Sequence, residues 1–141
     1  MPLPPHPGDL VPLEHHDCVR RLQDAPWVRV GFTDAEGHPQ VFPVSHLVYD
    51  GAVVFRTSPG RLLGVAAEGR EVAVEVDGGV VADRIGWSVL ARGATSLITD
   101  EAELERLHSL PFEPWAVPGE KTYWVRVEIE SLTGRRIVRH T

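Results

Sequence analysis

The stretch QVFPVSHLVYDGAVVFRT, residues 40–57, decides the fold that the sequence predicts. Val, Phe and Tyr, which favour strands, recur through both of its halves, and Asp50 and Gly51 stand between the halves. A two-residue type I′ turn requires positive φ at both central positions, which Asp and Gly adopt more readily than most residues. The stretch therefore predicts two antiparallel strands, Gln40–Tyr49 and Ala52–Thr57, joined by a tight turn.

Further strand signals lie on both sides of this hairpin. Segments rich in β-branched and aromatic residues predict strands at residues 27–33, 71–76, 86–99 and 123–129, with a further candidate at residues 135–139. Asp77-Gly78-Gly79 is expected to turn the chain after the second of these segments. Six or seven antiparallel strands without a βαβ rhythm predict a mainly β fold, built as a small barrel.

Three short helices complete the expected fold. Apolar positions at helical spacing predict them over residues 13–22, 61–68 and 101–110. Pro26 and Pro111 prevent the first and third helices from continuing, and Gly69 offers a left-handed cap to the second. Asp100 or Thr99 is expected to cap the start of the third helix.

Composition limits the class of protein and its compartment. The 141 residues are 43% hydrophobic and 24% charged, which is typical of one globular domain, and no apolar run reaches the roughly 18 residues of a membrane span. Proline-rich residues 1–12 are expected to form a flexible arm, and residues 13–141 the domain. The single cysteine, Cys18, and the lack of a leader pattern predict a soluble cytoplasmic protein.

Charge and motifs exclude several functions. The formal net charge is −6 and the arginines are scattered, which argues against nucleic acid as a partner. His15 and His16 would point about 100° apart on a helix, so they predict no metal site. The sequence has no nucleophile elbow, phosphate loop or dinucleotide fingerprint, so motifs assign no catalytic residue.

The segment FRTSPGR, residues 55–61, is the most informative one for function. Here a predicted strand passes through a tight turn into a predicted helix. Backbone N–H groups at the helix start, two hydroxyl groups and two guanidinium groups are together suited to holding a phosphate. Ser and Thr also cap helices routinely, and arginines are often surface charges, so a purely structural role stays open.

Several segments resemble a known family in their order and spacing. They are GHPQVFPV (37–44), FRTSPG (55–60), GWSVLARG (86–93), YWVRV (123–127) and TGRRI (133–137). Together they resemble the actinobacterial-type branch of the pyridoxamine 5'-phosphate oxidase-like family, from about Leu13 to Val138. The resemblance implies an FMN-binding split β-barrel that forms a homodimer, with two flavin clefts between the subunits.

The resemblance also implies which residues lie beside the flavin ring. Backbone around Pro43 and Val44 would follow the isoalloxazine edge, while Trp87 and Ser88 would approach from the partner subunit. His46 would place a proton donor near the N1–O2 side of the ring, or else face solvent as an ordinary strand residue. Trp87, Trp115 and Trp124 could each stack on a planar ring or pack in the core; Trp87 is favoured beside the site, and Trp115 is expected to pack in the core.

The phosphate end of the implied site departs from the family pattern. Arg56, Thr57 and Ser58 would contact the ribityl phosphate. Members of this branch usually continue with Gly-Ser-Lys-Leu, whereas this chain has Arg61 and Leu62 at the serine and lysine positions. Arg61 is expected to replace the missing lysine from one residue earlier, although the two side chains are not equivalent in geometry.

A flavin-dependent oxidoreductase is the function that the resemblance implies. FMN would transfer a hydride through N5, and the substrate would be a small molecule that the sequence does not identify. Some family members use a deazaflavin coenzyme, whose acidic tail would call for basic residues such as Arg92, Arg126 and Arg135. The alternative, motivated by the missing lysine, is a non-catalytic dimer that binds flavin or haem or serves as an accessory protein.

Overall fold

A computed structural model describes residues 8–112 and 122–139 of the chain. Within these residues lie nine strands, three α-helices and one 3-10 turn at Val81–Asp83. The elements are β1 (Asp9–Pro12), α1 (His15–Asp24), β2 (Val28–Thr33), β3 (Pro39–Val44), β4 (His46–Tyr49), β5 (Ala52–Thr57), α2 (Arg61–Ala67), β6 (Glu71–Val80), β7 (Ile85–Leu97), α3 (Glu101–Ser109), β8 (Tyr123–Glu128) and β9 (Ser131–Val138). The mainly β fold is therefore confirmed.

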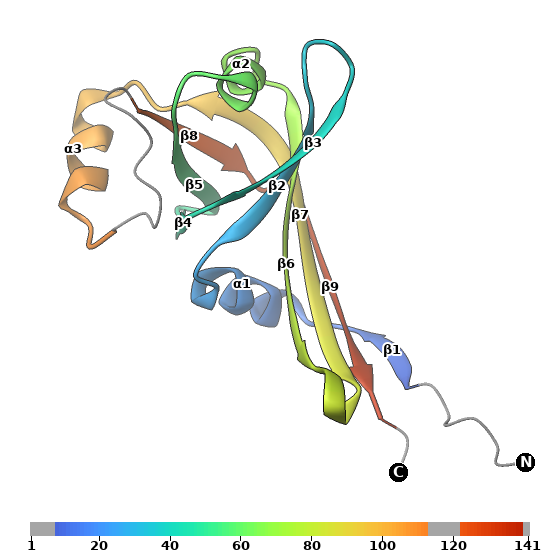
Figure 1. The fold of residues 1–141 in the computed structure, drawn as a ribbon. Coiled ribbons are helices and arrows are strands. Elements are labelled where there is room, and N and C mark those ends of the chain that lie inside the picture. Colours follow the sequence, from blue (N-terminus) through green and yellow to red (C-terminus); the bar gives the residue numbers. More distant parts are fainter. Residues whose placement is uncertain (1–7, 113–121, 140–141) are drawn as a thin grey trace, which may run out of the picture.

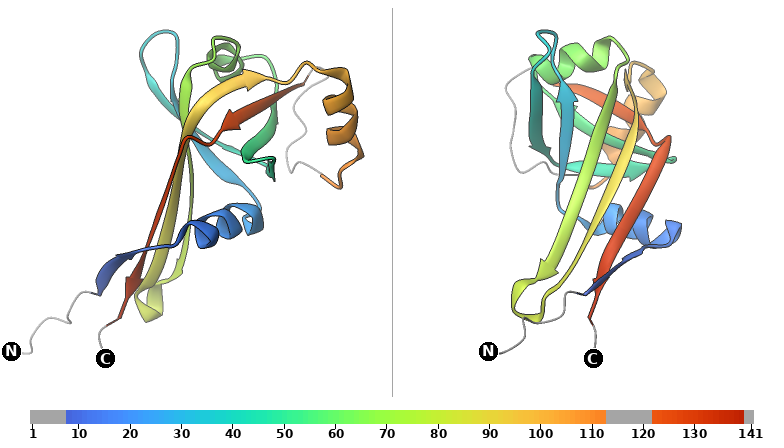
Figure 2. Two further views of the ribbon diagram at one scale, coloured as in Figure 1. Left: turned by 180° about the vertical axis from the view of Figure 1, so that it is seen from behind. Right: turned by 90° about the vertical axis from the view of Figure 1, so that its right-hand side faces the viewer.

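The strands form one curled antiparallel sheet. Their order is β3-β2-β6-β7-β8-β5-β4, with β9 beside β7 and β1 beside β9. β6, β7 and β9 continue well beyond the curled part and carry β1 with them (Figures 1 and 2). We call this projecting part, made of β1 with residues 76–90 and 133–138, the arm.

β7 belongs to both walls of the sheet. Its residues 95–97 pair with β8, whereas its residues 87–92 pair with β9. Gly93 lies where the partner changes, and a Cβ at this position would overlap the carbonyl oxygen of Glu128. A glycine is required here because the two backbones approach too closely for any side chain.

The hairpin around Asp50 and Gly51 is confirmed, since φ is 48° and 73° at these two residues. The single strand expected over Gln40–Tyr49 is wrong, because the chain changes sheet partner at Ser45. β3 pairs with β2 and β4 pairs with β5, at opposite ends of the strand order. The expected strand is divided because the barrel needs a corner between its two walls, which no local propensity encodes.

Two other expectations are wrong. Residues 9–12 do not belong to a flexible N-terminal segment, because they form β1 against β9, a partner far away in the sequence. Asp77-Gly78-Gly79 is not a turn but part of β6, and the chain turns at 81–84. Trp87 lies across Gly78, where a Cβ would come within 2.8 Å of the indole ring. This glycine therefore makes room for an aromatic ring instead of bending the chain.

The three expected helices are confirmed with small shifts of their ends. α1 packs on the sheet through Cys18 and Leu22, which are both buried. Asp100 caps the start of α3 as expected, because its carboxylate accepts a hydrogen bond of 3.0 Å from the N–H of Glu103. Gly69 follows α2 with a φ of 69°, as a left-handed cap requires. No helix of the described residues is long and apolar enough to cross a membrane.

Two apolar clusters lie on opposite sides of β5 and β8. The main core fills the barrel and includes Phe55, whereas a second cluster lies between α3 and strands β4, β5 and β8. The second cluster consists of Ala52, Val54, Ile98, Leu107 and Trp124. Because successive residues of a strand face opposite sides, Arg56 leaves β5 on the same side as Val54, toward α3. Trp115 lies outside the described residues.

Candidate functional site

Arg56 is the best-defined polar group of the predicted phosphate segment. It stands opposite Trp124 in the β5–β8 register. Its Nε and Nη2 donate to the hydroxyl oxygen of Thr122 at 3.2 and 2.6 Å, and its guanidinium carbon lies 5.6 Å from the centre of the Trp124 ring. An arginine has five N–H donors, so three have no acceptor among the described residues. The half-buried guanidinium is thus oriented by the protein and retains donors for an anion.

Thr57 and Ser58 continue the chain from Arg56 into the turn before α2. The Thr57 hydroxyl donates to the Ser58 carbonyl at 3.2 Å, and both side chains remain partly accessible. Gly60 then precedes the seven residues of α2. The predicted phosphate segment therefore forms the strand–turn–helix connection that its sequence indicates.

Arg61 is engaged in a contact that the sequence did not predict. Its Nε lies 3.4 Å from Oδ2 of Asp34, a carboxylate that is only 2% exposed. Asp34 also accepts hydrogen bonds of 3.0 and 2.9 Å from the N–H groups of Glu36 and His38, and one of 3.0 Å from the Gln40 side chain. These hydrogen bonds lower the pKa of Asp34, because they favour its charged form. Arg61 thus links the start of α2 to the β2–β3 turn.

Leu62 stands at the position where the resembling branch usually has a lysine, and its burial explains why a lysine would not fit here. This side chain is 2% exposed and belongs to the main core. A lysine at position 62 would have to bury its ammonium group among apolar side chains, which is costly. The neighbouring position is open to solvent, since the Arg61 side chain is 58% exposed.

Pro43 and Val44 lie on β3, at one end of the strand order. Among the described residues β3 pairs with β2 alone, so its other backbone edge has no strand partner there. Pro43 is exposed, whereas Val44 is half-buried and packs against the main core. The flavin contacts that the resemblance implies for Pro43 and Val44 stay a prediction.

His46 does not face solvent, so that expectation is wrong. Its side chain is buried, and Nε2–H donates to the Leu22 carbonyl at 2.6 Å. Nδ1 is buried without a hydrogen-bond partner among the described residues. Burial lowers the pKa of His46, because the charged form would lose its hydration. The ring joins the end of α1 to the start of β4, and its donor is already committed to the backbone.

Trp87 and Ser88 belong to the arm and lie on opposite faces of β7. Trp87 packs against Gly78 and under Arg21, whose guanidinium carbon is 4.4 Å from the ring centre. Ser88 lines an open hollow of about 610 Å³ on the other face, together with Leu90 and Arg135. This end of β7 lies far from α2 and the phosphate turn of the same chain (Figure 1). One chain therefore brings together Arg56, Thr57 and Ser58, but not the arm residues with them.

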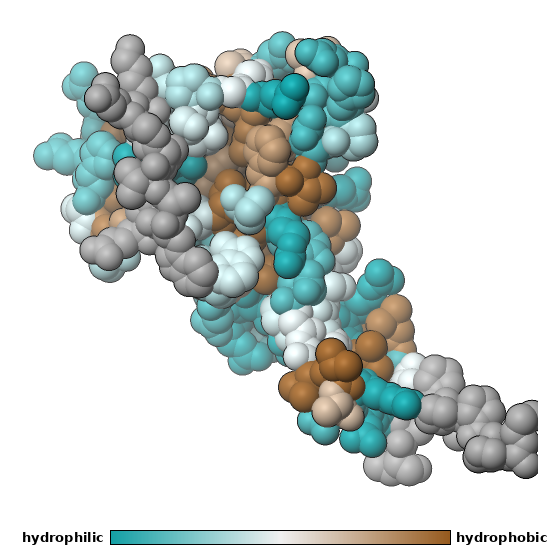
Figure 3. Space-filling model, viewed as in Figure 1, coloured by the Kyte–Doolittle hydropathy of each residue, from teal (hydrophilic) through white to brown (hydrophobic). Residues whose placement is uncertain are grey.

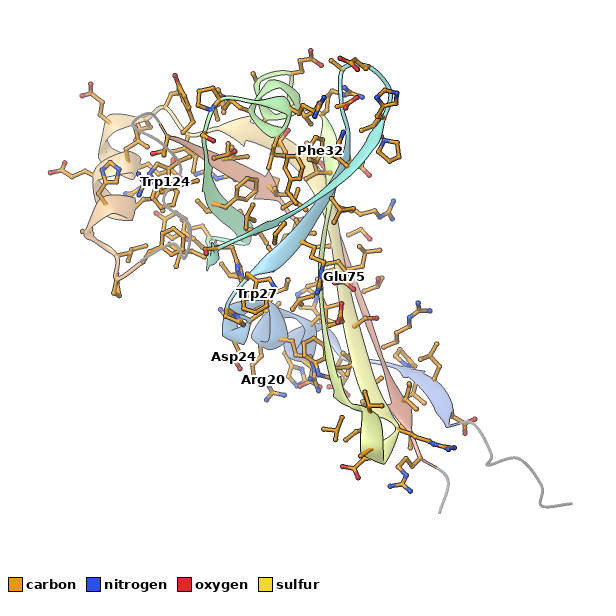
Figure 4. The ribbon with its side chains drawn as sticks, in the orientation of Figure 1. Arg20, Asp24, Trp27, Phe32, Glu75 and Trp124 are labelled. Carbon is orange, nitrogen blue, oxygen red and sulfur yellow. The ribbon has the colours of Figure 1, made fainter. Side chains whose placement is uncertain are left out.

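Sequence reasoning missed Thr122 and Asp34 as members of the site, and it left Trp124 open between a stacking platform for a planar ring and a core residue. Figure 4 shows Trp124 on the α3 side of the barrel. Neither Thr122 nor Trp124 could be assigned before the pairing of β5 with β8 was known. Asp34 carried the one usable signal, since Asp at the start of a short turn often accepts backbone N–H groups. The described part of the chain contains no cluster of three or more residues suited to a metal ion.

The curled antiparallel sheet, its free β3 edge and the projecting arm define a split β-barrel. The chain belongs to the pyridoxamine 5'-phosphate oxidase family, whose model matches residues 14–136.

Three known proteins are similar to this chain. An uncharacterized protein of Mycobacterium tuberculosis is 35% identical over 135 residues, covering 92% of this chain and 87% of the relative. A putative pyridoxamine 5'-phosphate oxidase from Corynebacterium glutamicum is 25% identical, with a TM-score of 0.75 and coverage of 94% and 96% of the two chains. The FAD binding protein from Mycobacterium smegmatis is 30% identical, with a TM-score of 0.74 and coverage of 93% and 100%.

Proposed function

We propose that this protein is a flavin-dependent oxidoreductase that acts on a small molecule. The observation that carries the proposal is Arg56, which is oriented by Thr122 and keeps three N–H donors beside the hydroxyls of Thr57 and Ser58. Charge-assisted hydrogen bonds of this kind suit a phosphate group. Family membership and the FAD-binding relative from M. smegmatis support a flavin as the owner of that phosphate.

In this proposal the chain's own residues bind and orient the cofactor. Arg56, Thr57 and Ser58 hold the ribityl phosphate, with Arg61 as a second cation whose charge Asp34 partly offsets. The β3 backbone at Pro43 and Val44 supports the ring edge. A bound flavin supplies the hydride chemistry at N5, so no side chain of this chain is assigned as a catalytic acid or base.

A homodimer completes the proposed site. The register places Pro43, Ser88 and the exposed Leu90 on one outer face of the sheet, opposite the main core. Val41 and Leu10 are 64% and 56% exposed on the same face. A two-fold pairing of this face would bring Ser88 of the partner subunit toward the β3 edge and cover these apolar side chains. Trp87 lies on the opposite face of β7, beneath Arg21, and fits this role less well than Ser88.

Cofactor identity has three candidates, FMN, FAD and the deazaflavin coenzyme, which share a ribityl phosphate. FMN is the simplest of them, because it needs no further site. The arginines considered for the deazaflavin tail are already partly engaged. Arg126 pairs with Glu103, and Arg92 lies 3.8 Å from Glu71. Arg135 has no ion pair among the described residues, so it is the best candidate to bind the acidic tail of a deazaflavin coenzyme.

A non-catalytic flavin- or haem-binding or accessory dimer is the second candidate function. One observation favours it. Arg61 is paired with Asp34 and Leu62 is buried, so Arg56 is left as the main cation of the turn that could bind a phosphate. A thermal-shift panel of FMN, FAD, deazaflavin coenzyme and haem separates the candidates, because a ligand that binds the folded state raises its stability.

Flavin binding is tested by the visible absorbance of the purified protein and by calorimetric titration with FMN, FAD and riboflavin. We expect a yellow protein, or a colourless one that binds added flavin. Arg56→Ala should weaken FMN binding by about 1.5–3 kcal/mol, since it removes a charge-assisted hydrogen bond. Arg106→Ala removes the same charge from an exposed position on α3 and should leave affinity unchanged. A colourless protein that ignores FMN, FAD and riboflavin would contradict the proposal.

A further inference from the structure

We propose that Thr122 and Trp124 are positioning residues for the phosphate-binding Arg56, so that the packing of α3 on Trp124 helps to set how tightly the cofactor phosphate is held. This inference rests on the flavin-binding function proposed above. Neither residue belongs to the segment that the sequence connects with phosphate, and both come from β8 or the residue just before it.

Thr122 fixes the direction of the Arg56 side chain. A free arginine loses considerable rotamer entropy when it grips a ligand. The Thr122 hydroxyl oxygen accepts from both Nε and Nη2, at 3.2 and 2.6 Å, so it holds one edge of the planar fork. The remaining donors therefore point in a set direction before the phosphate arrives, which reduces the entropic cost of binding.

Trp124 contacts the same guanidinium through the face of its indole ring. Its ring centre lies 5.6 Å from the guanidinium carbon, within the range of cation–π attraction. The indole is only 5% exposed, which limits its movement. Thr122 and Trp124 thus restrain Arg56 by two different kinds of contact.

α3 in turn holds the indole in place. Trp124 Nε1–H donates to Nε2 of His108 at 3.3 Å, and the Phe112 ring centre lies 5.7 Å from the indole. Leu107 of the same helix belongs to the buried cluster around Trp124. An ion pair between Glu103 and Arg126 further joins α3 to β8. Through these contacts the seating of α3 is connected to the position of Arg56.

The test compares FMN with riboflavin, which has the same ring but no phosphate. Thr122→Val keeps the shape of the side chain and removes the acceptor. We expect it to weaken FMN binding about tenfold, comparable to the loss of one hydrogen bond to a charged group, and to leave riboflavin affinity within about twofold. Trp124→Phe should shift FMN affinity in the same direction by a smaller factor, whereas Thr122→Ser, which restores the acceptor, should bind FMN like the wild type.

A double variant separates positioning from a general structural effect. On the Arg56→Ala background, Thr122→Val should have little further effect on FMN, because its action passes through the missing guanidinium. Equal losses of affinity for FMN and riboflavin would show that Thr122→Val disturbs the fold and would overturn the inference. FMN affinity that is unchanged in Thr122→Val, although Arg56→Ala binds FMN weakly, would also overturn it. If the wild-type protein binds neither FMN nor riboflavin nor FAD, the proposed function itself fails.

Discussion

At the scale of single residues, His46 is the least expected feature of the molecule. A strand histidine near the surface would keep both ring nitrogens in water, but α1 covers this ring and the Leu22 carbonyl accepts its Nε2–H. Nδ1 is left buried without a partner among the described residues. Because burial lowers the pKa of His46, the ring is neutral in the folded protein under conditions that would protonate it in the unfolded chain.

His46 should therefore make stability depend on pH. Below the ordinary histidine pKa of about 6.5 the unfolded chain binds more protons at this site than the folded one, so stability decreases as pH falls from 7.5 to 5. His46→Gln keeps a donor for Leu22 but does not titrate, and it should flatten this decrease. Urea unfolding at several pH values measures the effect, with the exposed His16→Gln as the control. Identical pH profiles for wild type and His46→Gln would contradict the assignment.

At the scale of elements, β7 connects the barrel to the arm. It exchanges β9 for β8 as a partner within a few residues, and this is possible because Gly93 lets the backbone pass the Glu128 carbonyl. The hydrogen bond from the Glu130 N–H to the Arg92 carbonyl, 2.9 Å long, closes the same corner. The crossing of these strands therefore depends on the absence of one side chain.

Gly93→Ala should destabilise the fold strongly. The added methyl group overlaps a backbone oxygen that cannot rotate away, so we expect a loss of about 3 kcal/mol or more in the free energy of unfolding. Gly64→Ala is the matched control, because a Cβ there meets nothing within 4 Å and lies in α2, where alanine favours the helix by up to about 1 kcal/mol. Equal urea midpoints for Gly93→Ala and the wild type would show that β7 can yield at this point.

At the scale of the whole molecule, the arm exposes apolar side chains that a single chain leaves uncovered. Figure 3 shows apolar surface gathered at its far end. The residues there are Val80, Val81 and Ile85, of which Val81 is 94% exposed. Exposed apolar groups concentrated in one place are typical of interaction surfaces. Val80 and Ile85 share the face of Trp87, opposite Ser88 and Leu90, so the tip would form a contact of the proposed homodimer separate from the outer face of the sheet.

The dimer should be sensitive to charge at the tip of the arm. Val81→Lys adds a charge to a side chain that makes little contact within its own chain, so the free energy of unfolding of the subunit should change by less than about 0.5 kcal/mol while association weakens. Light scattering over a range of concentrations measures the oligomeric state. Leu110→Lys, at the end of α3, is the control and should remain dimeric. A wild-type protein that is monomeric throughout would contradict the dimer, and an unaffected variant would exclude the tip from the interface.

The sequence by itself determined the features that local chemistry controls. Positive φ at Asp50 and Gly51, the cap at Asp100 and the strand–turn–helix at residues 55–61 depend on neighbouring residues, so they could be predicted and are confirmed. Only the tertiary structure decided the corner at Ser45, the pairing of β1 with β9 and the burial of His46. The Thr122 contact of Arg56 and the Asp34 contact of Arg61 belong to the same group. Each joins residues distant in sequence, and such contacts depend on how strands are ordered, which local propensity does not specify.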